Sequence, residues 1–227
     1  IFLIGACSQN EQEADSPAEV EKPSEPLVEY VWHKAGSEFS SDNLAMLVTS
    51  WNDMIDSMQC GGMRGANILT PEVGNDGYDF IWVMLWNSQE GRDKCWDDWT
   101  SNHQSKWDVM IDGIMQYDLD NTYLFGWTIG QMPKVENNSG QFVNSFNFCN
   151  YNEGFSSPSL ENHINNIVSI DWSDSFWFGL LDPKFEPADA KPDFVWLNLW
   201  ANNEEKNIAQ GKYYESDLPS TSGAAFT

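Results

Sequence analysis

Two stretches of the chain carry the same pattern of aromatic and aliphatic residues, about 115 positions apart. Residues 79–86 read Asp-Phe-Ile-Trp-Val-Met-Leu-Trp, and residues 193–200 read Asp-Phe-Val-Trp-Leu-Asn-Leu-Trp. Tryptophan is rare in most chains, so a shared D-F-x-W-x-x-L-W pattern indicates a duplicated unit. Because almost every position is apolar, the pattern predicts strands that are buried on both faces.

The residues around the first stretch predict the element order β-α-β-β-α-β. Alternating β-branched and aromatic residues predict a strand at 28–33. Apolar residues at three- and four-residue steps predict a helix from about 42 to 58, which the glycines at 61 and 62 stop. The remaining predicted elements are strands over 66–70, 79–86 and 122–129, a helix over about 90–115, and a turn over 118–121.

The second stretch lies in a copy of this unit that loses its pattern towards the end. Ser157 and Pro158 predict a helix start between a strand at 142–149 and strands at 175–181 and 193–200. Beyond Trp200 a helix could begin near 204, but Gly211 interrupts it, and residues 216–227 are small and polar. No strand in this copy matches 122–129. The predicted division of the chain is residues 1–26, a first unit at 27–132 and an incomplete second unit at 133–227.

Two β-α-β-β-α-β units in tandem resemble the dimeric α/β barrel superfamily, in which ferredoxin-like domains pair their sheets. The resemblance implies an α+β fold in which both units form one pseudo-dimeric α/β barrel. One face of strand 79–86 would then meet the partner sheet, and the other would lie under the helices. It also implies that the chain is a monomer that acts as a pseudo-dimer, or forms a higher oligomer.

The beginning of the sequence has a different character. Residues 1–7, Ile-Phe-Leu-Ile-Gly-Ala-Cys, resemble the tail of a secretory signal followed by a bacterial lipobox. This resemblance implies that Cys7 is lipidated, that the polar and acidic residues up to 26 form a tether, and that the protein is held at a membrane of the bacterial cell envelope. Ser8 after the cysteine favours the outer membrane. The alternative is an ordinary buried strand start.

Composition narrows the classes of partner. The 227 residues include 12 tryptophans and carry a formal charge of -24, with 41% hydrophobic residues. This supplies ample material for a packed core and makes nucleic-acid binding improbable, because the chain repels phosphate backbones. Cys60 follows the first predicted helix and Cys95 opens the second, so a disulfide between them is conceivable but is not fixed by spacing, and Cys149 is a further cysteine.

The aromatic row of the first unit is the candidate binding surface. In the superfamily, small molecules commonly lie between the sheet and its helices, and flat apolar rings stack well on aromatic side chains. The alternative is a bulky core without a ligand. The candidate ligand-binding residues are Phe80, Trp82, Met84, Trp86, Asn87, Trp99 and His33.

His103 is the candidate catalytic residue. Trp99 and Trp107 flank it one helical turn away on either side, and a histidine in such a setting could act as a base or ligate haem. Haem-degrading members of the superfamily use a helix histidine with asparagine and tryptophan, of which Asn87 and Trp86 are reminiscent. The alternative is a satisfied core or rim histidine, and His163 in the second unit is expected at the surface.

These observations support two classes of function. The first is an envelope lipoprotein whose barrel binds a small apolar or aromatic molecule, or serves as a scaffold. The second is a cofactor-independent monooxygenase, or a haem-binding or haem-degrading enzyme, that uses the pocket of the first unit. The sequence contains no G-x-S-x-G, H-E-x-x-H, C-x-x-C, P-loop or dinucleotide motif.

Overall fold

The computed structural model describes residues 25–185 and 191–227, in which strands and helices alternate much as the duplicated pattern predicts. The elements are β1 Leu27–Ala35, α1 Ser41–Ser57, β2 Met63–Leu69, β3 Phe80–Trp86, α2 Gln89–Asn102, α3 Gln104–Ile111, β4 Met115–Gln131, β5 Val143–Cys149, α4 Ser157–Val168, β6 Trp177–Pro183, β7 Phe194–Trp200, α5 Asn203–Glu215 and α6 Leu218–Ala225. None of these helices is both long enough and apolar enough to span a membrane.

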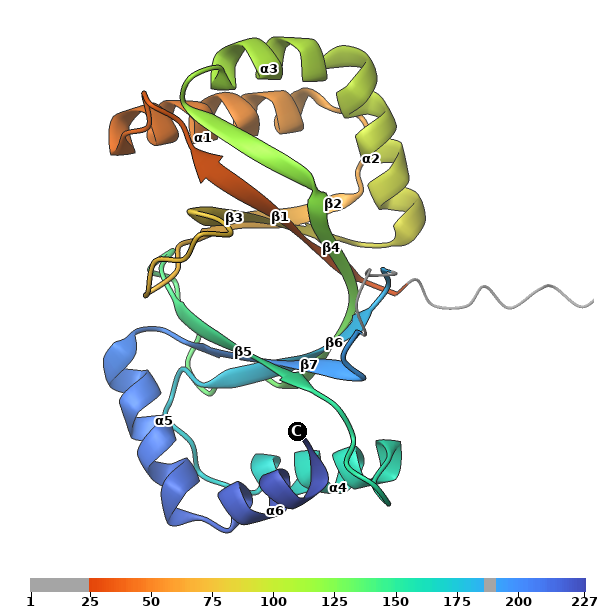
Figure 1. The fold of residues 1–227 in the computed structure, drawn as a ribbon, viewed down its shortest axis with the longest axis vertical. Helices are drawn as coiled ribbons and strands as arrows, with labels where there is room; N and C mark the ends of the chain where they lie inside the picture. The colour runs from red at the N-terminus through yellow and green to blue at the C-terminus, as the bar shows by residue number, and fades with distance from the viewer. Residues whose placement is uncertain (1–24, 186–190) are drawn as a thin grey trace, which may run out of the picture.

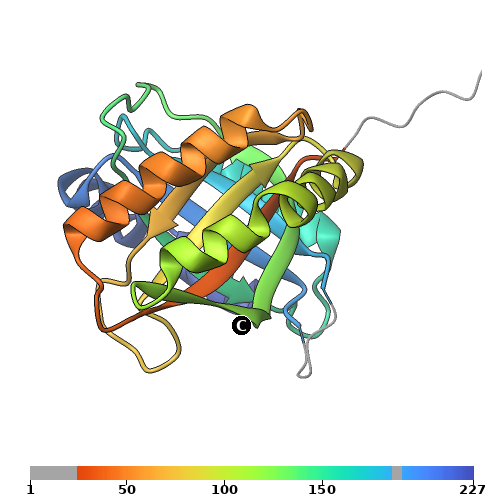
Figure 2. The ribbon, with the colours of Figure 1, turned by 90° about the horizontal axis from the view of Figure 1, so that it is seen from above.

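The strands form one antiparallel sheet in the order β2-β3-β1-β4-β6-β7-β5. We call β1–β4 with α1–α3 the first half, and β5–β7 with α4–α6 the second half. The sheet curls so that the strands of the two halves face each other, and each set of helices lies on the outside (Figure 1). Seen from above, α1, α2 and α3 cover the first half (Figure 2). The expected α+β barrel of two fused units is therefore confirmed.

The two faces of β3 are buried in different places. Phe80, Trp82, Met84 and Trp86 belong to the core beneath α1–α3. The alternate side chains Ile81 and Val83 belong to a separate core, which includes Val195 and Leu197 of β7 and lines the barrel interior. Burial against helices on one side and against the opposite strands on the other explains why the strand is apolar throughout.

Strand β4 joins the halves, because it pairs with β1 along its first part and with β6 along its second part. The turn predicted over 118–121 is wrong, since these residues lie inside the strand. The β1–β4 register shifts between Val31 and Trp32, and the polar residues form an irregularity there. The Asp118 carboxylate accepts hydrogen bonds from the Asp120 backbone N–H at 3.0 Å and the Asn121 side chain at 2.7 Å. Such side-chain hydrogen bonds can pair with free backbone groups in a bulge as well as in a turn.

The predicted helix over 90–115 is in fact two helices. The break is at His103, where φ is -124° and ψ is -32°. His103 follows the last residue of α2 and precedes the first residue of α3. The backbone N–H of His103 still bonds to the carbonyl of Trp99, and the carbonyl of His103 receives the N–H of Trp107. The helical direction changes while both tryptophans keep facing the sheet.

The end of the chain is more regular than its composition predicts. Gly211 lies within α5 and does not interrupt it, because a single helical glycine costs only about 1 kcal/mol relative to alanine and Ala209 anchors the helix in the core. The small residues after 216 form α6, followed by a bridge between Tyr151 and Phe226. Within the described residues of the second half no strand corresponds to β4, as expected.

A disulfide joins Cys60, which lies between α1 and β2, to Cys95 of α2. This pairing was conceivable from the sequence, and the structure forms it, leaving Cys149 of β5 as a free thiol in the described part of the chain. The bridge ties the middle of α2 to the segment between α1 and β2. Cys7, the proposed lipidation site, lies outside the described residues.

Candidate functional site

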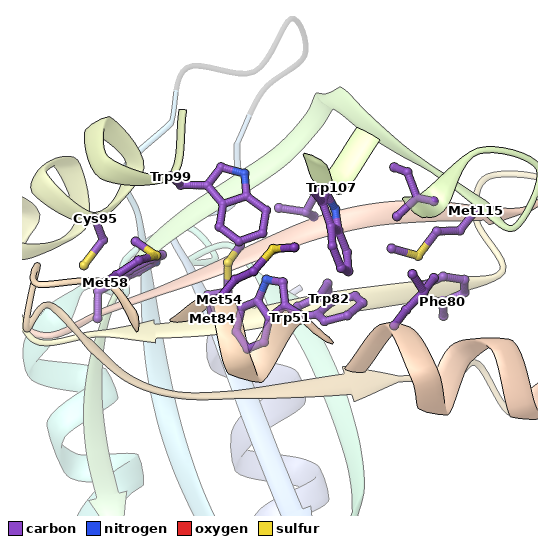
Figure 3. Packing of buried hydrophobic residues seen from close by; sticks show 14 of the residues in the cluster. Trp51, Met54, Met58, Phe80, Trp82, Met84, Cys95, Trp99, Trp107 and Met115 are labelled. Carbon is purple, nitrogen blue, oxygen red and sulfur yellow. The ribbon is translucent and has the colours of Figure 1, made fainter. Parts of the chain in front are cut away.

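A pocket of about 660 Å³ lies between the first half of the sheet and its helices. Indole rings from all three helices and from β3 form part of its walls. Trp99 and Trp107 reach from α2 and α3 towards Trp82 and Met84 of the sheet, and Trp51 approaches from α1 (Figure 3). The tryptophans that line the pocket are Trp51, Trp82, Trp86, Trp96, Trp99 and Trp107.

One wall of this pocket contains a buried carboxylate. Glu29 of β1 is only 1% exposed, and its Oε2 accepts hydrogen bonds from Nε1 of Trp86 and Nε1 of Trp96, each at 3.0 Å. Its Oε1 is ion-paired with the guanidinium of Arg92 on α2. Burial lowers the pKa of Arg92, but the hydrogen bonds and charges of Glu29 and Asp93 outweigh burial and raise that pKa above its ordinary value. Arg92 is therefore held in its charged form beside Glu29.

Two polar atoms on the pocket lining have no hydrogen-bond partner in the described structure. They are Nε of Arg92 and Oγ1 of Thr122, and both are buried. Buried polar atoms in folded proteins nearly always have a partner, so each unpaired one needs a reason. The Arg92 N–H is a donor and the Thr122 hydroxyl is a donor and an acceptor. Both are suited to a polar group on a bound molecule.

His33 of β1 also lines the pocket and is 6% exposed. Its Nδ1 lies 2.9 Å from the carbonyl oxygen of Val31, which can only accept, so Nδ1 carries the proton and Nε2 does not. Its ring stacks on Phe80, with centroids 5.1 Å apart. Burial lowers the pKa of His33 to about 4, against the smaller opposing effect of the Val31 hydrogen bond.

The structure brings together most of the residues expected from the sequence. Trp82, Met84, Trp86, Trp99 and His33 all line the pocket of the first half.

Phe80, Asn87 and His103 are not part of the lining. Phe80 is buried beside it, stacked on His33 and Phe39. Asn87 follows β3 and donates from Nδ2 to the carbonyl of Gly61. His103 sits at the junction of α2 and α3, with its ring 5.8 Å from that of Trp99.

Sequence reasoning missed Glu29, Arg92 and Trp96, which form the polar wall. Glu29 carried a usable signal, since it shares a strand face with Leu27 and Val31, and a carboxylate on such a face needs a partner. Arg92 and Trp96 are one helical turn apart on α2, so they present neighbouring groups to the sheet. The sequence does not say that this turn of α2 packs over Glu29.

A larger pocket of about 840 Å³ occupies the corresponding place in the second half. His163 of α4 lines it, half-buried against the rings of Trp196 and Phe226, so the expected surface position of His163 is wrong. It lies on the inner stripe of α4 with Leu160 and Ile167, three and four residues away. Burial lowers its pKa.

No family model and no curated protein matches the sequence. Solved structures do match. A chlorite dismutase from Candidatus Nitrospira defluvii, solved as a point mutant with cyanide, has a TM-score of 0.52 at 6% identity, over 90% of this chain and 88% of that one. A protein from Fusobacterium nucleatum with the provisional name of monooxygenase has a TM-score of 0.57 at 14% identity, over 89% and 88%. An anthrone oxidase-like protein has a TM-score of 0.50 at 11% identity, over 84% and 78%.

These likenesses extend over both halves of the barrel and include its helices. The identities of 6% to 14% are low enough that the likeness concerns the fold and not the chemistry of any pocket. The residues of the pockets must therefore carry any argument about function.

Proposed function

We propose that this chain, which has the dimeric α+β barrel fold, binds a small aromatic molecule with an oxygen substituent in the pocket of the first half. The observation that carries the proposal is the pair of unpaired polar atoms, Arg92 Nε and Thr122 Oγ1, on a lining whose other residues are mostly aromatic or aliphatic. A few polar groups among apolar walls are typical of small-molecule sites.

Size and shape support this assignment. The volume of about 660 Å³ lies within the range of ligand pockets, roughly 300 to 1,000 Å³. Indole rings on opposite walls offer faces and edges to a flat molecule, which gains contact area in defined geometry. The oxygen substituent would accept from the Arg92 N–H or exchange a hydrogen bond with Thr122. Glu29 holds Arg92, Trp86 and Trp96 in place for this contact.

We also propose that the protein is a cell-envelope lipoprotein and that Cys7 carries its lipid anchor. This proposal rests on the resemblance of residues 1–7 to a lipobox. Expression of the full chain with its own N-terminus, followed by separation of membranes, tests it. A Cys7→Ser variant that still sediments with membranes would contradict it.

Haem fits the described lining of this pocket less well than a smaller aromatic molecule. Haem takes an axial ligand and needs cations near its two propionates. His33 is the one imidazole in the lining, and its ring is packed against those of Phe80 and Trp82. Arg92, the one cation, is already paired with Glu29. Within residues 25–185 and 191–227 no three histidine, cysteine or acidic side chains are grouped to hold a metal ion.

The alternative function remains an oxygenase without a cofactor, or a haem protein. An oxygenase would act on the same bound aromatic molecule, so binding is the first property to test. Oxygen uptake in the presence of such a molecule would favour the oxygenase. A saturable Soret shift on titration with haemin, lost in His33→Gln or His103→Ala, would favour the haem protein.

Calorimetric titration of the protein with 2-naphthol tests the proposed binding. We expect saturable binding that Thr122→Val weakens roughly five- to tenfold, because the variant keeps the side-chain shape but loses the hydroxyl. Thr128→Val is the matched control, since Thr128 lies on the same strand and is exposed. Equal weakening by both variants, or saturable binding that neither affects, would reject this pocket as the site.

A further inference from the structure

The two halves place the same tryptophan beside different partners. Trp86 ends β3 and pairs with Leu27 of β1, and Trp200 ends β7 and pairs with Val143 of β5. Two residues further along the paired strands, the first half has Glu29 and the second has Ser145. The buried carboxylate of the first half is thus replaced by a hydroxyl in the second.

This replacement leaves an indole donor without an acceptor. Trp86 donates from Nε1 to Glu29, whereas Nε1 of Trp200 is buried and has no partner in the described part of the chain. Ser145 does not serve it: the Ser145 hydroxyl accepts from Asn198 Nδ2 at 3.4 Å, and no hydrogen bond joins it to Trp200. Trp200 is itself 5% exposed and lines the pocket of the second half.

The wall of the second pocket also has no counterpart of the Glu29–Arg92 ion pair. Arg92 and Lys206 are each the fourth residue of their helices, α2 and α5, but Lys206 bonds to Glu72 instead of turning to a buried carboxylate. The described lining contains no aspartate, glutamate, lysine or arginine. An anion buried there would have no cation to compensate for its lost hydration, so the pocket favours a neutral molecule.

The second pocket also has a larger volume, about 840 Å³ against about 660 Å³ for the first. Gln210 stands at the position in α5 that Trp96 has in α2, so a large ring is missing from the wall. The rings of Trp196 and Phe176 remain in the wall, the first stacked on Phe178 with centroids 4.4 Å apart and the second on Trp200 with centroids 5.7 Å apart. The space is suited to a flat ring system.

We propose that the pocket of the second half is a separate binding site for a neutral aromatic molecule with a carbonyl oxygen. The carbonyl oxygen accepts a hydrogen bond from Nε1 of Trp200, in the role that the Glu29 carboxylate has beside Trp86. This site does not depend on binding in the first half. It differs from the first in having no ion pair in its wall.

Three matched probes test the proposal by calorimetry: 2-acetylnaphthalene, 2-ethylnaphthalene, which lacks the carbonyl, and the 2-naphthoate anion. We expect the ketone to bind roughly five- to thirtyfold more tightly than the hydrocarbon, because only the ketone supplies the missing acceptor. The anion should bind most weakly. Trp200→Phe should reduce the affinity for the ketone to that for the hydrocarbon and leave the hydrocarbon almost unchanged.

Two further variants locate the binding. Gln210→Trp restores the ring that the first half has and should abolish the Trp200-dependent binding of the ketone, while Thr122→Val in the first half should leave that binding unchanged. Circular dichroism and a urea unfolding curve establish that each variant is folded. Equal affinities of parent and Trp200→Phe for the ketone would overturn the proposal, as would tighter binding of the anion, or no binding of the ketone up to its solubility.

Discussion

The guanidinium of Arg92 is ion-paired with Glu29, whose side chain is 1% exposed, and also with Asp93, whose side chain is 55% exposed. One cation thus contacts a buried carboxylate and a solvated one. The two contacts differ greatly in the environment of the acid, although they have the same chemistry.

Glu29→Gln should destabilise the fold by about 3 kcal/mol, because it leaves the Arg92 charge without its buried partner. The glutamine carbonyl can still accept from Trp86 and Trp96, so the effect isolates the charge. Urea unfolding followed by tryptophan fluorescence measures the change. Asp93→Asn is the control and should stay within about 0.5 kcal/mol of the parent. A similar loss in both variants would show that burial does not decide the strength of the pair.

Loss of the disulfide between Cys60 and Cys95 should lower the free energy of unfolding by about 3 kcal/mol. The bridge closes a loop over a sequence separation of 35 and so restricts the unfolded chain. A Cys60→Ser/Cys95→Ser double variant and the reduced parent should have the same urea midpoint. Cys149→Ser should not change the midpoint of the oxidised protein. An effect of reducing agent on the double variant would point to another bridge.

His33 should make stability depend on pH between about 6.5 and about 4. The pKa of His33 is lowered by burial, so between these values the unfolded chain binds a proton that the folded chain does not. Its contribution is fully present above pH 6.5 and decreases by about 3 kcal/mol as the pH falls to 4.

A His33→Gln variant separates this effect from the titration of the acidic residues. The difference in unfolding free energy between parent and variant, measured at several pH values, should fall across this interval and be flat above it. His163→Gln provides the comparison, since burial lowers the pKa of His163 as well. A pH-independent difference for His33→Gln would exclude a buried neutral imidazole.

Gly211→Ala should stabilise the protein by up to about 1 kcal/mol, since the residue is inside α5 and an added Cβ meets no atom within 4 Å. Gly62→Ala should have the opposite effect, by about 2 kcal/mol, because its Cβ would lie 2.1 Å from the carbonyl oxygen of Gly91. Thermal unfolding of both variants measures the contrast. Destabilisation by Gly211→Ala would show that α5 does not have the described conformation.

Much of the fold was predictable because β3 and β7 are apolar on both faces. A strand that is apolar on both faces must be covered by helices on one face and by other strands on the opposite face. The duplicated unit supplies those other strands. The elements that were mispredicted depend on context instead. The polar residues at 118–121 are typical of a turn, but a strand that pairs with β1 both before and after them can absorb them as an irregularity. The small residues of α6 have weak periodicity, and packing of Leu218 and Ala225 makes them helical.

The candidate site was predictable only in its aromatic part. Trp82, Met84 and Trp86 repeat at every second position of one strand, so the sequence groups them directly. Glu29 and Arg92 are 63 residues apart, and their contact exists only after α2 packs across the sheet. Such pairing depends on the angle and position of a helix, which local patterns do not encode.

Strand β4 makes the two halves of the barrel structurally dependent on each other. It is 17 residues long and hydrogen-bonds to β1 and β6, so it contributes backbone partners to both halves at once. Removing it from either neighbour would expose unpaired peptide groups and open the apolar interior that both halves line. We therefore expect the two halves to melt in a single cooperative transition, although each resembles a domain of its own.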